Sequence, residues 1–147
     1  MKDYEINSDT LALIFAGNKT RVYENNRVFL VDKLPNKIVS DSCSFFGSSL
    51  AGRQEGTNNL IGVSYKCPII IEESKKIIFF PTCSPRIDKC SWIGINNIEN
   101  YYSDHLGRTI IKFRNGRKIL LAESFGRIDN QILRATRLES VLRGRIN

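Results

Sequence analysis

Residues 42–57 read SCSFFGSSLAGRQEGT, a segment that begins apolar, breaks at Gly47 and restarts at the pair Ser48-Ser49. Serine hydroxyls accept hydrogen bonds from the free N–H groups of a first helical turn, so the serine pair predicts the start of a helix. That helix contains Gly52 and Gly56, and each glycine costs about 1 kcal/mol relative to alanine. The first serine and the two glycines recur every four residues, which leaves one edge of the helix nearly bare of side chains.

The bare edge has two interpretations, and the residues alone leave both open. In the first, the glycines allow the helix to pack tightly against the protein's own sheet. In the second, Ser48, Ser49 and the helix N-terminus hold a phosphate group, with Arg53 as a second contact one turn further along. The second interpretation predicts an anion-binding function.

Around this segment, turn signals and alternating apolar residues predict an α+β fold in a single domain covering residues 1–147. The predicted strands, mainly antiparallel hairpins and meanders, are Thr10–Phe15, Thr20–Glu24, Arg27–Asp32, Val63–Ile71, Lys76–Phe80, Trp92–Ile98, Thr109–Phe113 and Lys118–Ala122. The predicted helices are Pro35–Cys43, a second that runs to about Leu60, and an amphipathic C-terminal helix, Arg127–Arg143, followed by Gly144 as its cap.

Individual residues refine this arrangement. The first strand is apolar on both faces, which predicts a central position in its sheet. Pro68 lacks a ladder donor, so its strand should lie at an edge or contain a bulge. The pair Asn115-Gly116 is the strongest hairpin signal in the chain. The last helix has one core-facing stripe, formed by Ile128, Ile132, Ala135, Leu138 and Leu142.

Composition indicates a globular protein. The chain has 147 residues, of which 41% are hydrophobic and 25% are charged, so it can form one hydrophobic core and is unlike a disordered chain. No apolar run approaches the roughly 20 residues of a membrane span, and the N-terminus lacks the pattern of a secretory signal. We therefore expect a cytoplasmic protein with no membrane partner.

Charge favours a polyanionic partner. Lysine and arginine outnumber the acidic residues 22 to 15, which gives a net charge of +7. The first 80 residues are close to balanced, whereas the segment from Arg108 to Lys118 contains only basic charges. The C-terminal segment from Arg127 adds further arginines. Nucleic acid is the polyanion that such a distribution suggests.

Neither metal binding nor catalysis is indicated. The four cysteines form no CxxC pair, whereas structural zinc sites use closely spaced ligands. His105 is the single histidine, lies in a predicted turn, and has no spacing that pairs it with a cysteine. The chain contains neither a phosphate-binding loop nor a dinucleotide fingerprint. We expect no enzyme activity and no cofactor, and cysteines that are reduced and partly buried.

Three motifs stand out from the rest of the chain: Ser42-Cys43-x-Phe45-Phe46-Gly47-Ser48-Ser49-x-x-Gly52-Arg53-x-x-Gly56-Thr57, then Lys66-x-Pro68-Ile69, then Phe80-Pro81-Thr82. Together they resemble the ComK family of bacterial competence transcription factors. The resemblance extends from about Tyr4 to the C-terminal helix and is most specific at the centre. It implies a DNA-binding activator of DNA-uptake genes that binds paired AT-rich half-sites as a dimer or a pair of dimers. It also implies that the protein reads these sites largely through the minor groove.

Two positions depart from the family pattern. Leu50 stands where the family has an aromatic residue, and the sequence ends at Asn147, short of the family's usual C-terminal extension. In the family, that extension carries recognition by the adaptor of the Clp protease. We therefore expect proteolytic control through that adaptor, and full activation, to differ in this protein.

DNA binding requires phosphate contacts, which set affinity, and groove contacts, which set sequence preference. The predicted phosphate contacts are Ser48, Ser49, Arg53 and Lys66. The predicted groove contacts are Arg86, in a proline-stiffened loop, and Arg114 and Arg117, on either side of the predicted hairpin turn. Arg134 lies on a second face of the last helix and is a candidate contact to DNA or to another subunit. The same arginines also suit a solvated turn and a solvated helix face.

A competing hypothesis is a protein-interaction module that pairs with itself or with a longer relative without activating transcription. Trp92, Tyr101 and Tyr102 suit such an interface, and they suit a hydrophobic core equally well.

Overall fold

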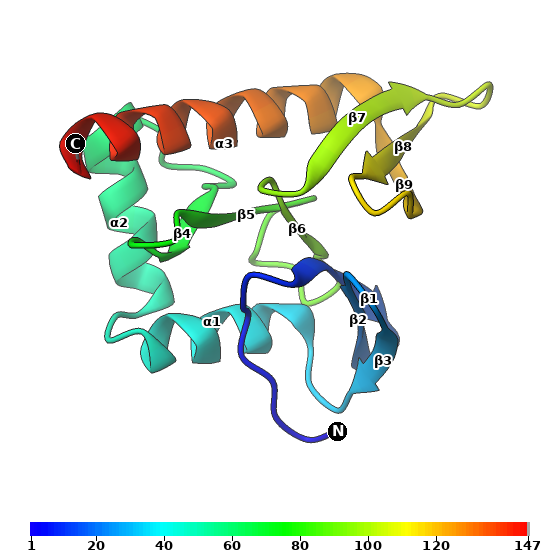
Figure 1. The fold of residues 1–147 in the computed structure, drawn as a ribbon, viewed down its shortest axis with the longest axis horizontal. Helices are drawn as coiled ribbons and strands as arrows, with labels where there is room; N and C mark the ends of the chain where they lie inside the picture. The colour runs from blue at the N-terminus through cyan, green and yellow to red at the C-terminus, as the bar shows by residue number, and fades with distance from the viewer. Residues whose placement is uncertain (147) are drawn as a thin grey trace.

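The computed structural model of the protein describes residues 1–146. In chain order, its elements are β1 (Thr10–Ala16), β2 (Lys19–Glu24), β3 (Val28–Val31), α1 (Pro35–Phe45), α2 (Leu50–Ile61), β4 (Ile69–Glu72), β5 (Ile77–Pro81), β6 (Trp92–Gly94), β7 (Ile98–Ser103), β8 (Arg108–Phe113), β9 (Lys118–Ser124) and α3 (Phe125–Ile146). Figure 1 shows two antiparallel sheets combined with three helices, which confirms the predicted α+β class.

A six-stranded sheet forms the middle layer. Its strand order is β3-β2-β1-β6-β5-β4, so the first three strands and the next three form two meanders. The meanders join where β1 pairs with β6, with Ala12 opposite Ile93 and Leu13 opposite Trp92. A second sheet, β7-β8-β9, is a separate three-stranded meander. In Figure 1, α1 lies on one side of the six-stranded sheet and α3 on the other, while α2 runs between them at one end.

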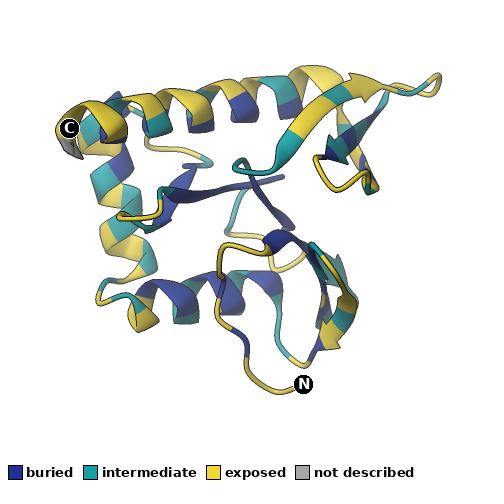
Figure 2. Ribbon diagram, viewed as in Figure 1, coloured by how far each residue is buried: buried dark blue, intermediate teal, exposed yellow. Residues whose placement is uncertain are grey.

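Each face of the six-stranded sheet has its own hydrophobic core. Successive side chains of a strand point to opposite faces, and β5 shows this alternation most clearly. Ile78 and Phe80 belong to the core with α3 and the second sheet, whereas Ile77 and Phe79 belong to the core with α1. Figure 2 shows the result, with buried residues along the middle strands and on the inner sides of α1 and α3.

Several sequence predictions are confirmed. β1 is central, between β2 and β6, and β4 is an edge strand with a bulge, as its preceding proline indicated. The Asn115-Gly116 turn connects β8 to β9. Ser49 is the N-cap of α2, where its hydroxyl accepts a hydrogen bond from the Gly52 N–H at 2.9 Å. All five residues of the predicted apolar stripe on α3 are buried.

Three predicted boundaries are wrong. The strand predicted from Val63 begins only at Ile69, because Lys66 adopts a left-handed φ of 52° and Pro68 cannot donate to a ladder. The strand predicted for residues 92–98 ends at Gly94 as β6, and β7 (Ile98–Ser103), which was not predicted, follows in the other sheet. Between them the Asn96 side chain bonds the Lys76 carbonyl at 2.7 Å and the Ile78 N–H at 3.2 Å, in place of ladder bonds. Finally, α3 continues through Gly144 to Ile146.

No helix within residues 1–146 combines the length and the apolar character needed to cross a lipid bilayer.

Position 94 accepts only glycine because the aromatic ring of Phe79 lies directly opposite it. Gly94 pairs with Phe79 across β5 and β6, and a Cβ atom at this position would lie 2.8 Å from Phe79 Cζ. Phe79 is itself buried, so the ring has no room to move away.

Gly94→Ala is expected to lower the free energy of unfolding by about 1–3 kcal/mol, measured by urea denaturation with Trp92 fluorescence. The matched control is Gly56→Ala, where an added Cβ meets nothing within 4 Å and alanine should stabilise the helix by about 1 kcal/mol. Equal stability of Gly94→Ala and the parent would contradict this account of the sheet.

Glu24 is a buried carboxylate whose protonation is coupled to folding. Burial raises its pKa, but hydrogen bonds from Tyr4 Oη at 2.5 Å, Arg27 Nε at 2.7 Å and Asn7 Nδ2 at 3.5 Å outweigh burial, and the net pKa lies below the ordinary value. A carboxyl whose pKa is lowered by folding stabilises the folded state above its unfolded pKa and loses that contribution as the pH falls.

The free energy of unfolding is therefore expected to fall as the pH drops from about 4.5, the ordinary pKa, through the lowered pKa of Glu24. Tyr4→Phe removes one of the three donors and should cost about 1–3 kcal/mol at neutral pH. Glu24→Gln should flatten the acid limb of a plot of unfolding free energy between pH 7 and pH 3. An acid limb unchanged in Glu24→Gln would show that another carboxylate is responsible.

Candidate nucleic-acid interface

The eight predicted DNA-binding residues fall into three separate places. Ser48, Ser49 and Arg53 lie at the start of α2, and Arg114 and Arg117 lie on the β8–β9 hairpin. Lys66, Arg86 and Arg134 come together from three different segments of the chain. Each place has its own local chemistry.

At the start of α2, acidic side chains surround the predicted phosphate contact. Arg53 Nη1 forms an ion pair with Glu73 Oε1 at 3.0 Å, and the Arg53 side chain is only 15% exposed. Ser48 and Arg53 line a hollow of about 530 Å³ together with Glu72 and Glu73 from the β4–β5 turn. Two carboxylates beside the hollow repel an anion, and one of them already neutralises the guanidinium. This place is therefore poorly suited to a phosphate group.

The bare edge of α2 is not packed against the sheet, so the first interpretation of the glycines is wrong. A Cβ atom added to Gly56 would meet nothing within 4 Å, and one added to Gly52 would meet only the hydroxyls of Ser48 and Ser49. Of the helix residues, only Thr57 and Ile61 are buried. The edge is open to solvent within residues 1–146.

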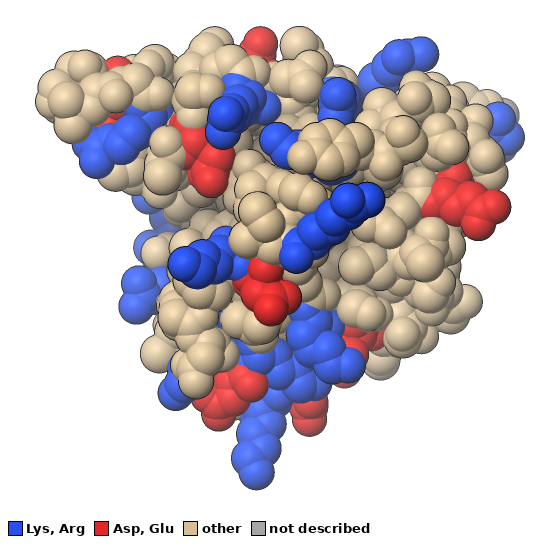
Figure 3. All heavy atoms as spheres, turned by 180° about the vertical axis from the view of Figure 1, so that it is seen from behind, with Lys and Arg blue, Asp and Glu red and all other residues tan. Residues whose placement is uncertain are grey.

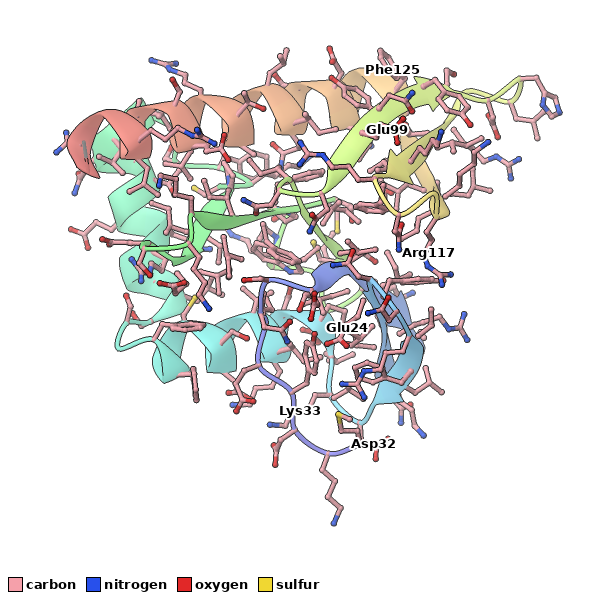
Figure 4. The ribbon with its side chains drawn as sticks, viewed as in Figure 1. Glu24, Asp32, Lys33, Glu99, Arg117 and Phe125 are labelled. Atoms are coloured by element: carbon pink, nitrogen blue, oxygen red, sulfur yellow. The ribbon has the colours of Figure 1, made fainter. Side chains whose placement is uncertain are left out.

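The hairpin arginines behave differently from each other. Arg117 stacks its guanidinium over the Tyr23 ring at 5.5 Å, and the Asn115 side chain donates to the Asn25 carbonyl at 3.0 Å. Figure 4 shows Arg117 extending from the hairpin toward the six-stranded sheet. The hairpin tip is thus docked on β2 of the same chain. Arg114 is exposed and lines a different hollow, beside α3, together with Glu99, Glu139 and Arg143.

The third place is built around Gln131, a buried polar residue of α3 that is 4% exposed. Its Nε2 donates to the Lys66 carbonyl at 3.0 Å and to the Pro81 carbonyl at 2.8 Å. Arg134, one turn further along α3, donates to the Tyr65 carbonyl at 3.1 Å. These bonds tie the 63–68 loop to the helix and to the end of β5. They hold Lys66 in its left-handed conformation, which costs a non-glycine residue about 1 kcal/mol or more.

Sequence analysis did not identify Gln131 or Tyr65. A signal for Gln131 was present, because it lies three residues after Ile128 and four before Ala135 and therefore falls on the apolar stripe of α3. A polar side chain at a core-facing position must find hydrogen-bond partners inside the protein. Tyr65 carries no comparable signal, since its role depends on how the loop folds.

Two hollows meet at Tyr65 and Lys66. The larger, of about 490 Å³, lies between α2 and the loops and is lined by Gln54, Asn58 and Arg86 among others. The smaller, of about 180 Å³, is lined by Arg127, Asn130 and Arg134 of α3. We use the name Lys66 surface for the surface formed by Tyr65, Lys66, Arg86, Arg127 and Arg134.

The Lys66 surface carries positive charge that the chain itself does not compensate. Within residues 1–146, none of its four basic side chains forms an ion pair. By contrast, many other basic residues are paired: Lys19, Arg27, Lys33, Lys37, Arg53, Arg108, Lys112 and Arg143. One carboxylate, that of Glu55, also lines the larger hollow. Figure 3 shows the face turned away from the viewer in Figure 1, where lysine and arginine side chains are spread across the centre with tan surface and a few acidic side chains between them.

The cysteine and carboxylate chemistry of the described residues offers no metal centre. Among residues 1–146, no three histidine, cysteine or acidic side chains lie close enough together to hold a metal ion. All four cysteines are free thiols, and three of them are buried. Burial raises the pKa of the Cys43 thiol to about 11, which keeps it protonated at neutral pH.

The three aromatic residues named for the protein-interaction hypothesis lie in different environments. Trp92 is fully buried and donates its indole N–H to Asn36 Oδ1 at 2.8 Å, so it cannot form an interface. Tyr101 is half-buried and donates to Asp129 at 2.6 Å, which attaches β7 to α3. Tyr102 is 37% exposed on the outer face of the second sheet. The strand register places Ile110 and Leu120 beside it in one row across the three strands.

The family model described as ComK protein matches residues 1–147. The chain therefore belongs to the ComK family. It is 33% identical over 151 residues to the competence transcription factor of Bacillus subtilis (strain 168), and the match covers all of this chain and 79% of that protein. No solved structure matches the chain.

Proposed function

We propose that this protein is a regulator of competence genes that binds double-stranded DNA through the Lys66 surface. Membership of the ComK family and the similarity to a competence transcription factor support the regulatory role. The observation that supports the location is the set of four basic side chains on the Lys66 surface that have no acidic partner within residues 1–146.

Physical chemistry explains why such a surface suits DNA. Each lysine or arginine that contacts a phosphate releases a condensed counterion, which favours binding and makes it salt-dependent. A basic residue that already has a carboxylate partner must break that ion pair first, so Arg53, paired with Glu73, contributes less than Lys66 or Arg127. The Gln131 and Arg134 hydrogen bonds hold the loop in place before DNA arrives, which reduces the entropy lost on binding.

The residues of the Lys66 surface take different roles in this proposal. The phosphate contacts are Lys66, Arg127 and Arg134. Arg127 and Arg134 lie on α3, and Lys66 lies on a loop attached to α3, so the three side chains are fixed relative to one another. Arg86 is exposed on the loop between β5 and β6, next to Pro85, and extends into a groove of the DNA. The family resemblance makes the AT-rich minor groove the groove we propose, since a narrow minor groove attracts arginine through its negative potential.

Fluorescence anisotropy titrations test this proposal. Two labelled duplexes of equal length are used, one with paired AT-rich half-sites and one GC-rich, at several salt concentrations. Lys66→Ala and Arg127→Ala should each weaken binding to both duplexes about five- to tenfold and make the salt slope shallower by about one. Arg86→Ala should weaken the AT-rich complex more, so the preference between the duplexes narrows. Lys75→Ala is the matched control, because Lys75 is an exposed cation of the β4–β5 turn outside the Lys66 surface. If all three surface variants bind as the parent does, the Lys66 surface is not the DNA contact.

A second candidate function is self-association. The row of Tyr102, Ile110 and Leu120 favours it, because Leu120 is 50% exposed and the three apolar side chains adjoin across the second sheet. Paired half-sites also fit a dimer geometrically. Static light scattering at micromolar concentrations should show a dimer for the parent and a monomer for Leu120→Glu. A parent that remains monomeric and still binds DNA would contradict association through this sheet.

A further inference from the structure

Cys83 and Cys90 lie opposite each other at the base of the loop between β5 and β6. The antiparallel register of these strands pairs Pro81 with Trp92 at their ends. The next residues, Thr82 and Ser91, are joined by two hydrogen bonds, from Thr82 N to the Ser91 carbonyl at 2.8 Å and from Ser91 N to Thr82 Oγ1 at 3.2 Å. The same register therefore continues one step further and places the two cysteines side by side.

The side chains confirm this proximity. Cys90 Sγ donates a hydrogen bond to the Cys83 carbonyl at 3.2 Å. Residues directly opposite in an antiparallel pair have Cβ atoms about 4.5–5.5 Å apart, close to the separation that a disulfide needs. Cys90 is fully buried, whereas Cys83 is partly exposed. A reagent in solution can therefore reach Cys83 first.

We propose that Cys83 and Cys90 form a reversible disulfide that closes the Arg86 loop when the protein meets a low-molecular-weight disulfide. The Cys83 thiolate attacks one sulfur of the small disulfide, which forms a mixed disulfide and expels one small thiolate. The Cys90 thiolate then attacks Cys83 Sγ, which forms the protein disulfide and expels the second small thiolate. The two protons lost by the cysteines protonate the two departing thiolates, so one small disulfide is reduced for each protein disulfide formed.

Hydrogen bonds hold the loop at both its tip and its base. Asn36 Nδ2 of α1 donates to the Pro85 carbonyl at 2.8 Å and to the Ile87 carbonyl at 3.3 Å, which holds the tip of the loop. The Thr82 and Ser91 hydrogen bonds hold its base. Because both ends of the loop are already held, most of the ordering entropy has been lost in the folded thiol form, and only a small local approach of the two cysteines remains.

The other two cysteines lack these features. Cys43 belongs to α1, and the Cys67 thiol donates to the carbonyl of Val63 within its own loop at 3.3 Å. Burial raises the pKa of both thiols, and no second cysteine contributes to either value. The pKa of Cys90 is raised to about 12, first by burial and further by the hydrogen bond and charge of the Cys83 thiol. The thiolate fraction of Cys90 is therefore small at neutral pH, and disulfide formation should accelerate up to about tenfold for each unit of pH.

The test uses the full chain in its folded state with oxidised glutathione as the small disulfide. After the reaction, the protein is denatured, its free thiols are blocked with an alkylating reagent, and it is digested with trypsin. Trypsin cleaves after Arg86 and Lys89, which both lie between the two cysteines, so the disulfide appears as two linked peptides that separate on reduction. The expected result is the loss of these two thiols, while Cys43 and Cys67 remain alkylated.

Two single variants supply the controls. Cys90→Ser should accumulate glutathione on Cys83, because no second thiol can displace it. Cys83→Ser should keep all its remaining thiols free. This substitution removes the less buried cysteine of the pair, so serine disturbs the core least there. The proposal is overturned if the parent also retains glutathione on Cys83 without linking it to Cys90. It is equally overturned if Cys83 links to Cys43 or Cys67, or if no thiol of the folded parent reacts. This inference does not rest on DNA binding, since every readout is a covalent one.

Discussion

The pairing of β1 with β6 is the interaction on which the rest of the structure depends. It involves only short strands, with Ala12 opposite Ile93 and Leu13 opposite Trp92, yet it turns two local meanders into one sheet. Once joined, the sheet has two continuous apolar faces, and neither face can be left exposed to water. α1 covers one of them, and α3 with the second sheet covers the other. The contact is long-range in sequence, so its closure entropy is offset only when both cores form together.

The basic surface is a consequence of that layering. Because α3 lies against the face that contains Phe80, its polar residue Gln131 reaches the end of β5 and the 63–68 loop at the same time. Both hydrogens of the Gln131 amide are used, and its oxygen accepts from Arg134 at 3.4 Å. A satisfied buried amide specifies one arrangement of the loop, since any other arrangement leaves a donor unpaired inside the protein. Lys66, Arg127 and Arg134 therefore share a surface for structural reasons, and Arg86 joins them from the opposite side of the larger hollow.

Sequence reasoning was accurate where the signal is local. Pro35, Ser49 and Asn115-Gly116 act on their immediate neighbours, and the structure places a helix start, a helix cap and a hairpin turn at these positions. It failed where a side chain elsewhere in the fold decided the outcome. Apolar residues continue past Gly94, but Asn96 binds the backbone of β5 there and ends the strand. The glycine edge of α2 was judged from the helix alone, whereas its exposure depends on which elements surround the helix.

The candidate site divides in the same way. The sequence by itself determines a basic chain of α+β class with motifs typical of the ComK family, because composition, turn residues and motif spacing are properties of the chain itself. Which basic residues act together was decided only by the tertiary structure. A neighbouring carboxylate neutralises a guanidinium locally. Whether an arginine's charge is available to a partner therefore depends on the carboxylate that folding brings beside it. Folding places Glu73 against Arg53, while it leaves Lys66 and Arg86 without an ion pair among the described residues. Strand pairing and helix packing set those distances, and no pattern in the linear sequence records them.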